Sequence, residues 1–300
     1  MSIGFIGVGV MGSAIAHRLL DAGYTLNVYN RSSSRLAPLL DKGATALSTP
    51  AEVARHSEHI ISCVLDTAAV DDVCFGPAGL INALRPAQVV VEHGTFSPAT
   101  ARRVAERADA RGAHFLDAPV TGGPEGATAG TLTTMVGGSA EALGTVSDVL
   151  HDYTSKIVHI GASGRGLELK LVNQLLVSCH LVAAAEASVL IDSLGLPPDL
   201  CQQALMSGWA ASTMLAHVLP RAAVDDYASG GATIGGLIEA QRLVADLARN
   251  HQLDLTLFDS TRETFSRAIS MGLAEYDPAA LTRNYYLSAA AAPADTEAAT

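Results

Sequence analysis

The hydrophobic positions in the first half of the chain form short runs separated by helical patterns. Five runs have the composition of buried β-strands and lie within residues 3–7, 25–30, 59–65, 89–94 and 114–119. Residues 11–23 and 97–112 show the apolar spacing of helices; Ser97 and Pro98 start the second of these, and a glycine ends each. This alternation predicts an α/β domain of the Rossmann type, with a mostly parallel sheet, over residues 1–161.

The second half of the chain has the pattern of helices alone. One helical pattern runs from about residue 166 to residue 194 and stops at the segment GLPP, and no convincing strand follows it. A chain of 300 residues also exceeds the usual size of a single hydrophobic core. We therefore predict a second, all-α domain over residues 162–300, which begins with a long interdomain helix.

Charge and composition narrow the class of partner. The formal net charge is −11 and no basic stripe occurs, which argues against nucleic acid. Ser178, His180 and Glu186 interrupt the longest apolar stretch, so no membrane span is expected. The N-terminus lacks the basic region of a signal peptide. The cysteines, far apart and without metal-ligand spacing, are Cys63, Cys74, Cys179 and Cys201. We expect a cytoplasmic protein with free thiols, no metal site and a small-molecule substrate.

A glycine motif near the N-terminus predicts a dinucleotide site. Gly7, Gly9 and Gly12 have the spacing GxGxxG, directly after a predicted strand and at the start of a predicted helix. The first glycine allows a tight turn, the second lets the backbone approach a pyrophosphate, and the third lets helix and strand pack closely. We expect this turn, with Val10 and Met11, to bind the cofactor; the alternative is a glycine-rich turn without a ligand.

The end of the second predicted strand indicates which cofactor is bound. An NAD site usually carries an acidic residue there for the ribose 2′-hydroxyl, but this chain has the segment YNRSSSR. Arg31, supported by Asn30, Ser32 and Arg35, can form charge-assisted bonds with a 2′-phosphate instead. We therefore predict NADP(H) in preference to NAD(H). A solvated basic turn is the alternative.

Four segments in order give the chain a resemblance to a known family. They are FIGVGVMGSAIAHRLLDAG, NRSSSR, DAPVTGGPEGATAGTLTTMVGG and GASGRGLELKLVNQ. With these segments the chain resembles the β-hydroxyacid dehydrogenases, such as 3-hydroxyisobutyrate dehydrogenase and tartronate semialdehyde reductase, over nearly its whole length. The resemblance implies a Rossmann-type domain, a long interdomain helix and a helical domain that makes homodimers or homotetramers.

The resemblance also implies roles for individual residues. It makes Lys170 the catalytic residue, with Asn173 beside it at the substrate. It assigns the substrate carboxylate to Thr121, Gly122 and Gly123. It assigns contacts with the nicotinamide to Val64, Leu65 and Thr95.

Lys170 has the chemistry that this role requires. A lysine that acts as a general base must lose its charge near neutral pH, and desolvation against Leu169, Leu171 and Val172 would lower its pKa. Asn173 lies three residues further along the predicted helix, on the same face, where its amide can orient the amine. The alternative is a structural lysine paired with Glu168 or Glu186.

The chain departs from the family pattern at several positions. The segment EHGT places His93 near the expected nicotinamide, either as a second titrating group or as a loop-packing residue. Asp66 stands where the family commonly has proline, which makes the loop similar to that of imine reductases. Glu239 replaces the family lysine near the cofactor or substrate and could favour a substrate amine. Trp209 either lines the substrate cleft or packs between helices.

Together these features predict an NADP-dependent oxidoreductase. It would transfer hydride between the nicotinamide and a β-hydroxy acid, a β-hydroxy amino acid, or the matching aldehyde or ketone, with Lys170 as general acid and base. An imine reductase is the first alternative, although those enzymes generally lack this lysine. A non-catalytic nucleotide-binding protein is the second.

Overall fold

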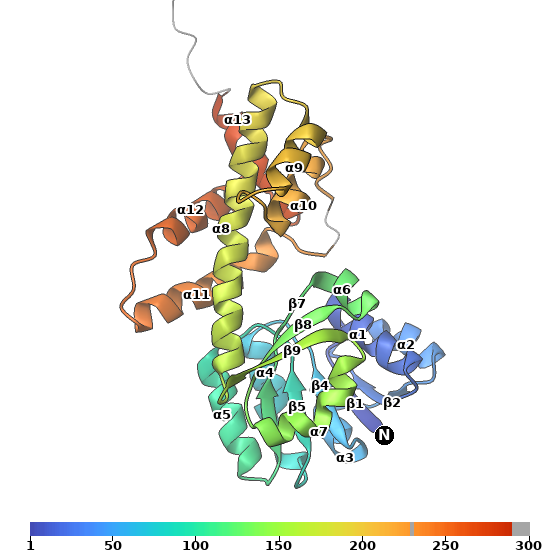
Figure 1. The fold of residues 1–300 in the computed structure, drawn as a ribbon. Helices are drawn as coiled ribbons and strands as arrows, with labels where there is room; N and C mark the ends of the chain where they lie inside the picture. Colours follow the sequence, from blue (N-terminus) through green and yellow to red (C-terminus); the bar gives the residue numbers. More distant parts are fainter. Residues whose placement is uncertain (229–230, 290–300) are drawn as a thin grey trace, which may run out of the picture. The chain divides into compact units, whose positions relative to one another are not determined.

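The computed structural model describes residues 1–228 and 231–289, so residues 229–230 and 290–300 of the predicted second domain lie outside the described residues. The chain forms two compact units, of which the first is Met1–Val172 and the second begins at Asn173. Figure 1 shows the elements of each unit. The division falls within one long helix, whose first two turns belong to the first unit.

The first unit is built on a sheet of nine strands. Its strands are β1 (Ser2–Ile6), β2 (Thr25–Tyr29), β3 (Thr45–Ala46), β4 (His59–Ser62), β5 (Val89–Glu92), β6 (His114–Asp117), β7 (Val120–Thr121), β8 (Leu132–Gly137) and β9 (Thr154–Gly161). Their order is β3-β2-β1-β4-β5-β6-β8-β7, and β9 pairs with β8. Strands β1 to β6 are parallel, in registers such as Ser2 opposite Thr25, whereas β8 runs antiparallel to β6 and β7. The strand order reverses between β1 and β4, where open α/β sheets bind their ligands.

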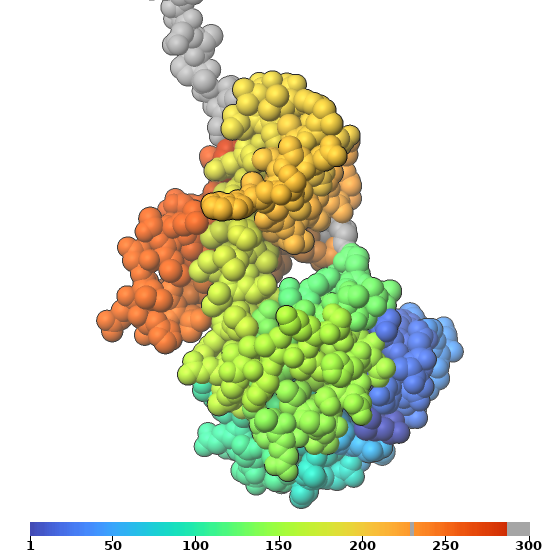
Figure 2. Space-filling view, viewed as in Figure 1, coloured from blue at the N-terminus to red at the C-terminus, as the bar shows by residue number. Residues whose placement is uncertain are grey.

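Helices connect these strands and cover the sheet. They are α1 (Val10–Asp21), α2 (Ala37–Asp41), α3 (Pro50–His56), α4 (Thr67–Phe75), α5 (Pro98–Asp109), α6 (Gly123–Ala129) and α7 (Ala140–His151), with 3-10 turns η1 (Ser33–Leu36) and η2 (Ile81–Ala83). Figure 2 shows that α6, α7 and β9 form much of the surface of this unit on the side in view. The Rossmann-type α/β prediction is confirmed.

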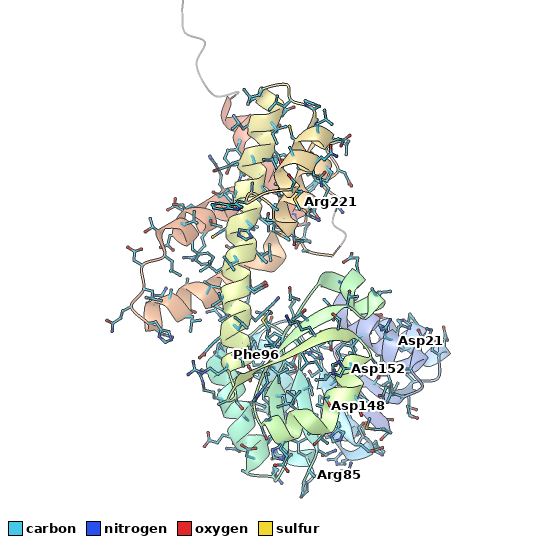
Figure 3. The ribbon with its side chains drawn as sticks, in the orientation of Figure 1. Asp21, Arg85, Phe96, Asp148, Asp152 and Arg221 are labelled. Carbon is cyan, nitrogen blue, oxygen red and sulfur yellow. The ribbon has the colours of Figure 1, made fainter. Side chains whose placement is uncertain are left out.

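Two apolar clusters hold the first unit together. Because side chains alternate along a strand, Phe5 joins one cluster, with α1 and α7, while Ile6 joins the other, with α3 and α5. Phe96, labelled in Figure 3, is fully buried in the second cluster, as is Leu167 from the long helix. Burial on both faces explains why the central strands are nearly continuous apolar runs.

The observed strands differ from the predicted ones in two ways. The predicted runs 59–65 and 89–94 extend beyond β4 and β5, because Cys63–Leu65 and His93–Gly94 leave the sheet and form loops at its carboxyl edge. Strands β3, β7, β8 and β9 were not predicted, and much of β9 is exposed. Ser97 does occupy the N-cap position of α5, but its side chain forms no capping hydrogen bond.

The second unit is helical throughout its described part. Its elements are α8 (Arg165–Ser193), shared with the first unit, α9 (Pro198–Met206), α10 (Thr213–Ala222), α11 (Ile238–Asn250), α12 (Thr256–Ser270), α13 (Arg283–Ala289), and 3-10 turns η3 (Gly235–Leu237) and η4 (Pro278–Thr282). Leu181 and Ala185 of α8 are buried with Leu215, Val218 and Phe265 in one core cluster. These helices confirm the predicted all-α part of the fold.

Helix α8 is long and apolar enough to cross a membrane, judged by length and composition alone. Core helices of folded domains have the same properties. In this structure α8 supplies buried side chains to the core of the second unit, and its first turns pack against the first unit's sheet. We therefore describe α8 as a core helix of this fold.

Candidate active site

The glycine-rich turn between β1 and α1 has the geometry of a nucleotide cradle. Gly7 has a φ of +90°, which favours glycine. A Cβ on Gly12 would lie 2.0 Å from the carbonyl oxygen of Gly7, so helix and strand approach too closely for any side chain. A Cβ on Gly9 would meet nothing within 4 Å. The turn is therefore tight where the chain packs and open where a pyrophosphate would approach, which fits a dinucleotide.

The loop after β2 places basic side chains in solvent. Arg31, Ser32 and Arg35 are exposed, and neither guanidinium has a hydrogen bond or ion pair within the described residues. The side chain of Asn30, in contrast, forms hydrogen bonds with the backbone. Its Oδ1 accepts a hydrogen bond from Val8 N at 2.9 Å, and its Nδ2 donates to the carbonyl of Ser32 at 2.9 Å. The Asn30 amide therefore ties the basic loop to the glycine-rich turn.

The loops after β4 and β5 continue the same edge of the sheet. Val64 and Thr95 are half-buried, and Leu65 is 84 % exposed. Asp66 caps α4 by accepting a hydrogen bond from Ala69 N at 2.8 Å. This capping hydrogen bond explains an aspartate at position 66 without any relation to imine reductases.

The buried side chain of Glu92 forms hydrogen bonds with both of these loops, a role that the sequence did not predict. The residue is 2 % exposed, and its Oε1 accepts hydrogen bonds from Val64 N at 3.2 Å and Gly94 N at 2.8 Å. Burial raises the pKa of this carboxyl to about 7, because desolvation outweighs the hydrogen bonds that favour its charged form. The sequence signal was an acidic residue at the end of a wholly apolar strand.

His93 faces the interior of the protein. Its Nδ1 lies 2.6 Å from the carbonyl oxygen of Ala118, and its Nε2 lies 2.8 Å from the hydroxyl of Tyr153. The ring is 3 % exposed, and burial lowers its pKa to about 4. The loop-packing interpretation is therefore correct, and the suggestion of a second titrating group at the substrate is wrong.

The segment expected to hold the substrate carboxylate connects β7 to α6. Thr121 is half-buried and ends the strand, while Gly122 and Gly123 have φ values of +128° and +70°. A Cβ on Gly123 would lie 2.8 Å from Oε2 of Glu125, so an acidic side chain stands beside this backbone. The positive φ values explain why two glycines are needed here.

Asp117, also missed from the sequence, fixes the start of α8. Its fully buried carboxylate accepts hydrogen bonds from Gly164 N at 2.6 Å and Leu167 N at 2.9 Å. A Cβ on Gly166 would lie 2.3 Å from the carbonyl oxygen of Met135, so this turn packs directly on the sheet. Lys170 follows one turn later, and its position is therefore set by the carboxyl edge of the sheet.

Lys170 is buried and unpaired. It is 8 % exposed, and its amine forms no hydrogen bond or ion pair within the described residues. Glu168 instead pairs with Arg102 and with Arg165, the latter at 2.7 Å. Glu186 accepts a hydrogen bond from the hydroxyl of Tyr285 at 2.9 Å. The alternative of a lysine paired with either glutamate is therefore wrong.

Burial lowers the pKa of Lys170 to about 8. The neighbours named from the sequence do not all contribute, because Leu169 and Val172 are 36 % and 50 % exposed and only Leu171 is buried. Asn173 donates from Nδ2 to Oε1 of Gln174 at 3.0 Å, and within the described residues no hydrogen bond joins its amide to the amine of Lys170.

Two further predicted residues lie in the second unit, Trp209 exposed and Glu239 half-buried. The Trp209 side chain is fully solvent-exposed, so its packing alternative is wrong. Glu239 forms a two-point ion pair with Arg242, at 2.7 Å and 2.8 Å. Its carboxylate is thus paired within its own helix, by an arginine that also pairs with Asp246 at 2.7 Å.

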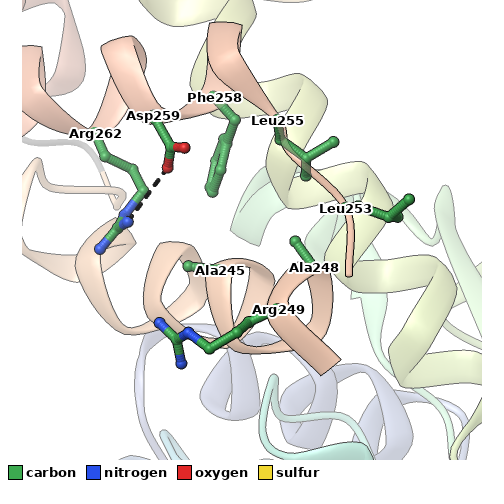
Figure 4. A pocket seen from close by; sticks show the side chains of 8 residues that line it. All are labelled: Ala245, Ala248, Arg249, Leu253, Leu255, Phe258, Asp259 and Arg262. Carbon is green, nitrogen blue, oxygen red and sulfur yellow. Dashed lines mark ion pairs between the residues drawn. The ribbon is translucent and has the colours of Figure 1, made fainter. Parts of the chain in front are cut away.

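A separate hollow in the second unit lies between α11 and α12 (Figure 4). Phe258, Ala245 and Ala248 line it with apolar surface, and Arg262 pairs with Asp259 at 3.6 Å beside it. The residues that line it include none of those predicted for the active site.

Comparisons with known proteins agree with this geometry. Residues 2–161 match the family model described as the NAD binding domain of 6-phosphogluconate dehydrogenase, and residues 164–285 match that of the NAD-binding region of NADP-dependent 3-hydroxyisobutyrate dehydrogenase. The 2-(hydroxymethyl)glutarate dehydrogenase of Eubacterium barkeri is 30 % identical over 94 % of each chain.

Solved structures show the same fold. A 3-hydroxyisobutyrate dehydrogenase from Salmonella typhimurium superposes with a TM-score of 0.85 at 28 % identity, over 95 % of this chain and all of the other. Psf3, solved in complex with NADP+ and 2-OPP, gives 0.86 at 27 % identity, over 94 % of this chain and 99 % of its own. The chain belongs to the β-hydroxyacid dehydrogenase family, and it is an NAD(P)-dependent oxidoreductase that acts on hydroxyl groups.

Proposed function

We propose that the chain interconverts a β-hydroxy acid, or a β-hydroxy amino acid, and the matching aldehyde or ketone, with NADP(H) as cofactor and Lys170 as general acid and base. The observation that carries this proposal is Lys170 itself, a buried residue whose amine has no hydrogen-bond or ion-pair partner among the described residues and which lies in the same unit as the glycine-rich turn. A buried cation without a partner is costly, so its retention there favours a chemical role.

The residues of the chain hold the reacting groups in position and transfer the proton. When bound, the nicotinamide accepts or donates the hydride. In the oxidation direction the neutral amine of Lys170 takes the proton of the substrate hydroxyl, and in the reduction direction the ammonium donates a proton to the carbonyl oxygen. Asp117 holds the first turn of α8, and through it the amine, in place.

Preference for NADP(H) rests on the loop after β2. Arg31 is exposed and has no ion-pair partner among the described residues, Ser32 lies beside it, and no acidic residue stands at the strand end. The NADP+ complex of Psf3 supports the same choice. We expect Arg31→Asp to weaken NADP+ binding at least tenfold and to strengthen NAD+ binding relative to it, because a charge-assisted phosphate contact is lost and a ribose acceptor is gained. Equal affinities of the parent protein for the two cofactors would contradict the assignment.

The substrate class follows from the segment Thr121 to Gly123. Its backbone is accessible and suits a carboxylate, while the acidic Glu125 beside it favours a substrate that also carries a hydroxyl or amine. We propose Trp209 and Asn173 as substrate contacts. We also propose Glu239 as a substrate contact, with its carboxylate held in an ion pair with Arg242. We further propose that the protein works in the cytoplasm as a homodimer or homotetramer, as the family resemblance suggests.

Lys170→Met tests the proposal. We expect the variant to lose turnover of hydroxy acids by at least 100-fold while it keeps its affinity for NADPH, because proton transfer is removed and the cofactor site is not. A panel of β-hydroxy acids and β-hydroxy amino acids with NADP+ measures the oxidation, and aldehydes and cyclic imines with NADPH measure the reduction. Full residual activity would reject the role of Lys170. Activity on imines alone, or on no substrate, would favour the two alternative functions.

A further inference from the structure

The Glu92 carboxylate forms hydrogen bonds with both loops at the nicotinamide end of the expected cofactor site. Its Oε1 accepts from Val64 N, in the loop after β4, and from Gly94 N, in the loop after β5. A Cβ on Gly94 would lie 2.3 Å from the carbonyl oxygen of Val64, so the two loops are also in direct contact. The carboxylate is buried beneath them and cannot itself touch the solvent side of the loops.

We propose that Glu92 is a positioning residue, whose ionised carboxylate braces these two loops and thereby sets the affinity for the cofactor. The inference rests on the proposed placement of Val64, Leu65 and Thr95 against the nicotinamide. A charged acceptor shared by two N–H groups holds them more firmly than a neutral one. Protonation of Glu92 therefore loosens the brace and weakens cofactor binding.

Glu92 is the member of its cluster that changes charge near neutral pH. Its pKa is raised to about 7, whereas burial raises the pKa of Cys63, at the end of β4, to about 12. Cys74, on α4, also interacts with Glu92, and burial raises the pKa of its thiol well above the usual range. His93 has its pKa lowered to about 4. Between pH 6 and pH 8 the thiols and the imidazole stay neutral while Glu92 ionises.

Direct binding titrations test the inference without any need for turnover. We expect Glu92→Gln, which keeps a neutral acceptor, to bind NADP+ and NADPH about fivefold more weakly than the parent at pH 8. The ratio of the two dissociation constants should fall towards one at pH 6, where the parent is itself protonated. Hydrogen exchange at the Val64 and Gly94 amides should be faster in the variant without cofactor.

Glu58→Gln is the matched control. Glu58 also accepts a hydrogen bond from a backbone amide, Ser2 N at 2.8 Å, but at the opposite end of the sheet strands. If Glu92→Gln does not fold, Glu92→Asp replaces it: the shorter carboxylate should lower affinity while keeping the pH dependence. An unchanged cofactor affinity at pH 8, or a loss of affinity for NADP+ but not for NADPH, would contradict the proposed role of Glu92. Failure of the Lys170→Met experiment would leave this result standing, because it measures binding and not chemistry.

Discussion

Lys170 shows how burial changes the chemistry of a single residue. The residue is 8 % exposed and its amine donates no hydrogen bond and meets no opposite charge within the described residues, so desolvation acts on the pKa without opposition. A pKa of about 8 leaves a useful fraction of both protonation states near neutral pH. The same burial costs stability whenever the amine is charged.

We therefore expect Lys170→Met to be inactive yet more stable than the parent at pH 7. The pKa of the folded state lies below the ordinary value of 10.5, so the unfolded chain binds more protons between pH 8 and 10.5. The stability deficit of the parent relative to Lys170→Met should shrink by about 3 kcal/mol across that interval. Urea unfolding at several pH values measures it, and Lys156→Met, at an exposed position, controls for net charge. A deficit independent of pH would show that the amine is not desolvated.

The residues of the site differ in how far the sequence could predict them. The sequence predicts the turn at Gly7, Gly9 and Gly12, because the spacing of these three glycines alone specifies it. The hydrogen bonds that Glu92 and Asn30 form with other loops could not be predicted, since each joins a backbone group more than twenty positions away. The ion pair between Glu239 and Arg242 was predictable, because the two residues are three positions apart on one helix.

At the scale of elements, α8 is positioned by its first turn. The carboxylate of Asp117 at the end of β6 accepts two of the N–H groups that a helix start leaves unpaired. Gly166 then brings the helix against the backbone of β6 and β8. The direction of the helix, and with it the place of Lys170, is decided at this junction.

Asp117→Asn should weaken this junction. One N–H loses its acceptor and faces an amide instead, so we expect a loss of about 2–3 kcal/mol in the free energy of unfolding. Displacement of the helix start should also lower kcat at least tenfold. Ser97→Ala is the matched control, because Ser97 occupies the N-cap of α5 without a side-chain hydrogen bond and should change neither quantity. Normal stability and turnover in Asp117→Asn would refute the anchoring role.

The elements themselves were predicted where their pattern is local. Five of the six parallel strands β1 to β6, and the long helix, follow from runs of apolar residues and from helix-ending glycine and proline. Strands β8 and β9 were missed because one lies in a glycine-rich segment and the other exposes much of its length, so neither has the signature of a buried strand. Pairing with a distant strand, not local composition, makes them part of the sheet.

At the scale of the whole molecule, the catalytic assignment depends on the first unit. The glycine-rich turn, the basic loop, the brace at Glu92, the segment Thr121 to Gly123 and Lys170 all belong to it. Asn173, Trp209 and Glu239 belong to the second unit, where the substrate side chain would be selected. The residues proposed for cofactor binding and for proton transfer therefore lie within one compact unit.

The central claim is that Lys170 carries a proton near neutral pH, and its amine can be observed directly. The chain contains only three lysines, Lys42, Lys156 and Lys170, so the NMR spectrum of protein labelled at the lysine ε-carbon is simple. We predict that the resonance missing from Lys170→Met titrates near pH 8 in the parent protein. If that resonance titrates only above pH 10, the amine is not desolvated and Lys170 cannot be the general base described here.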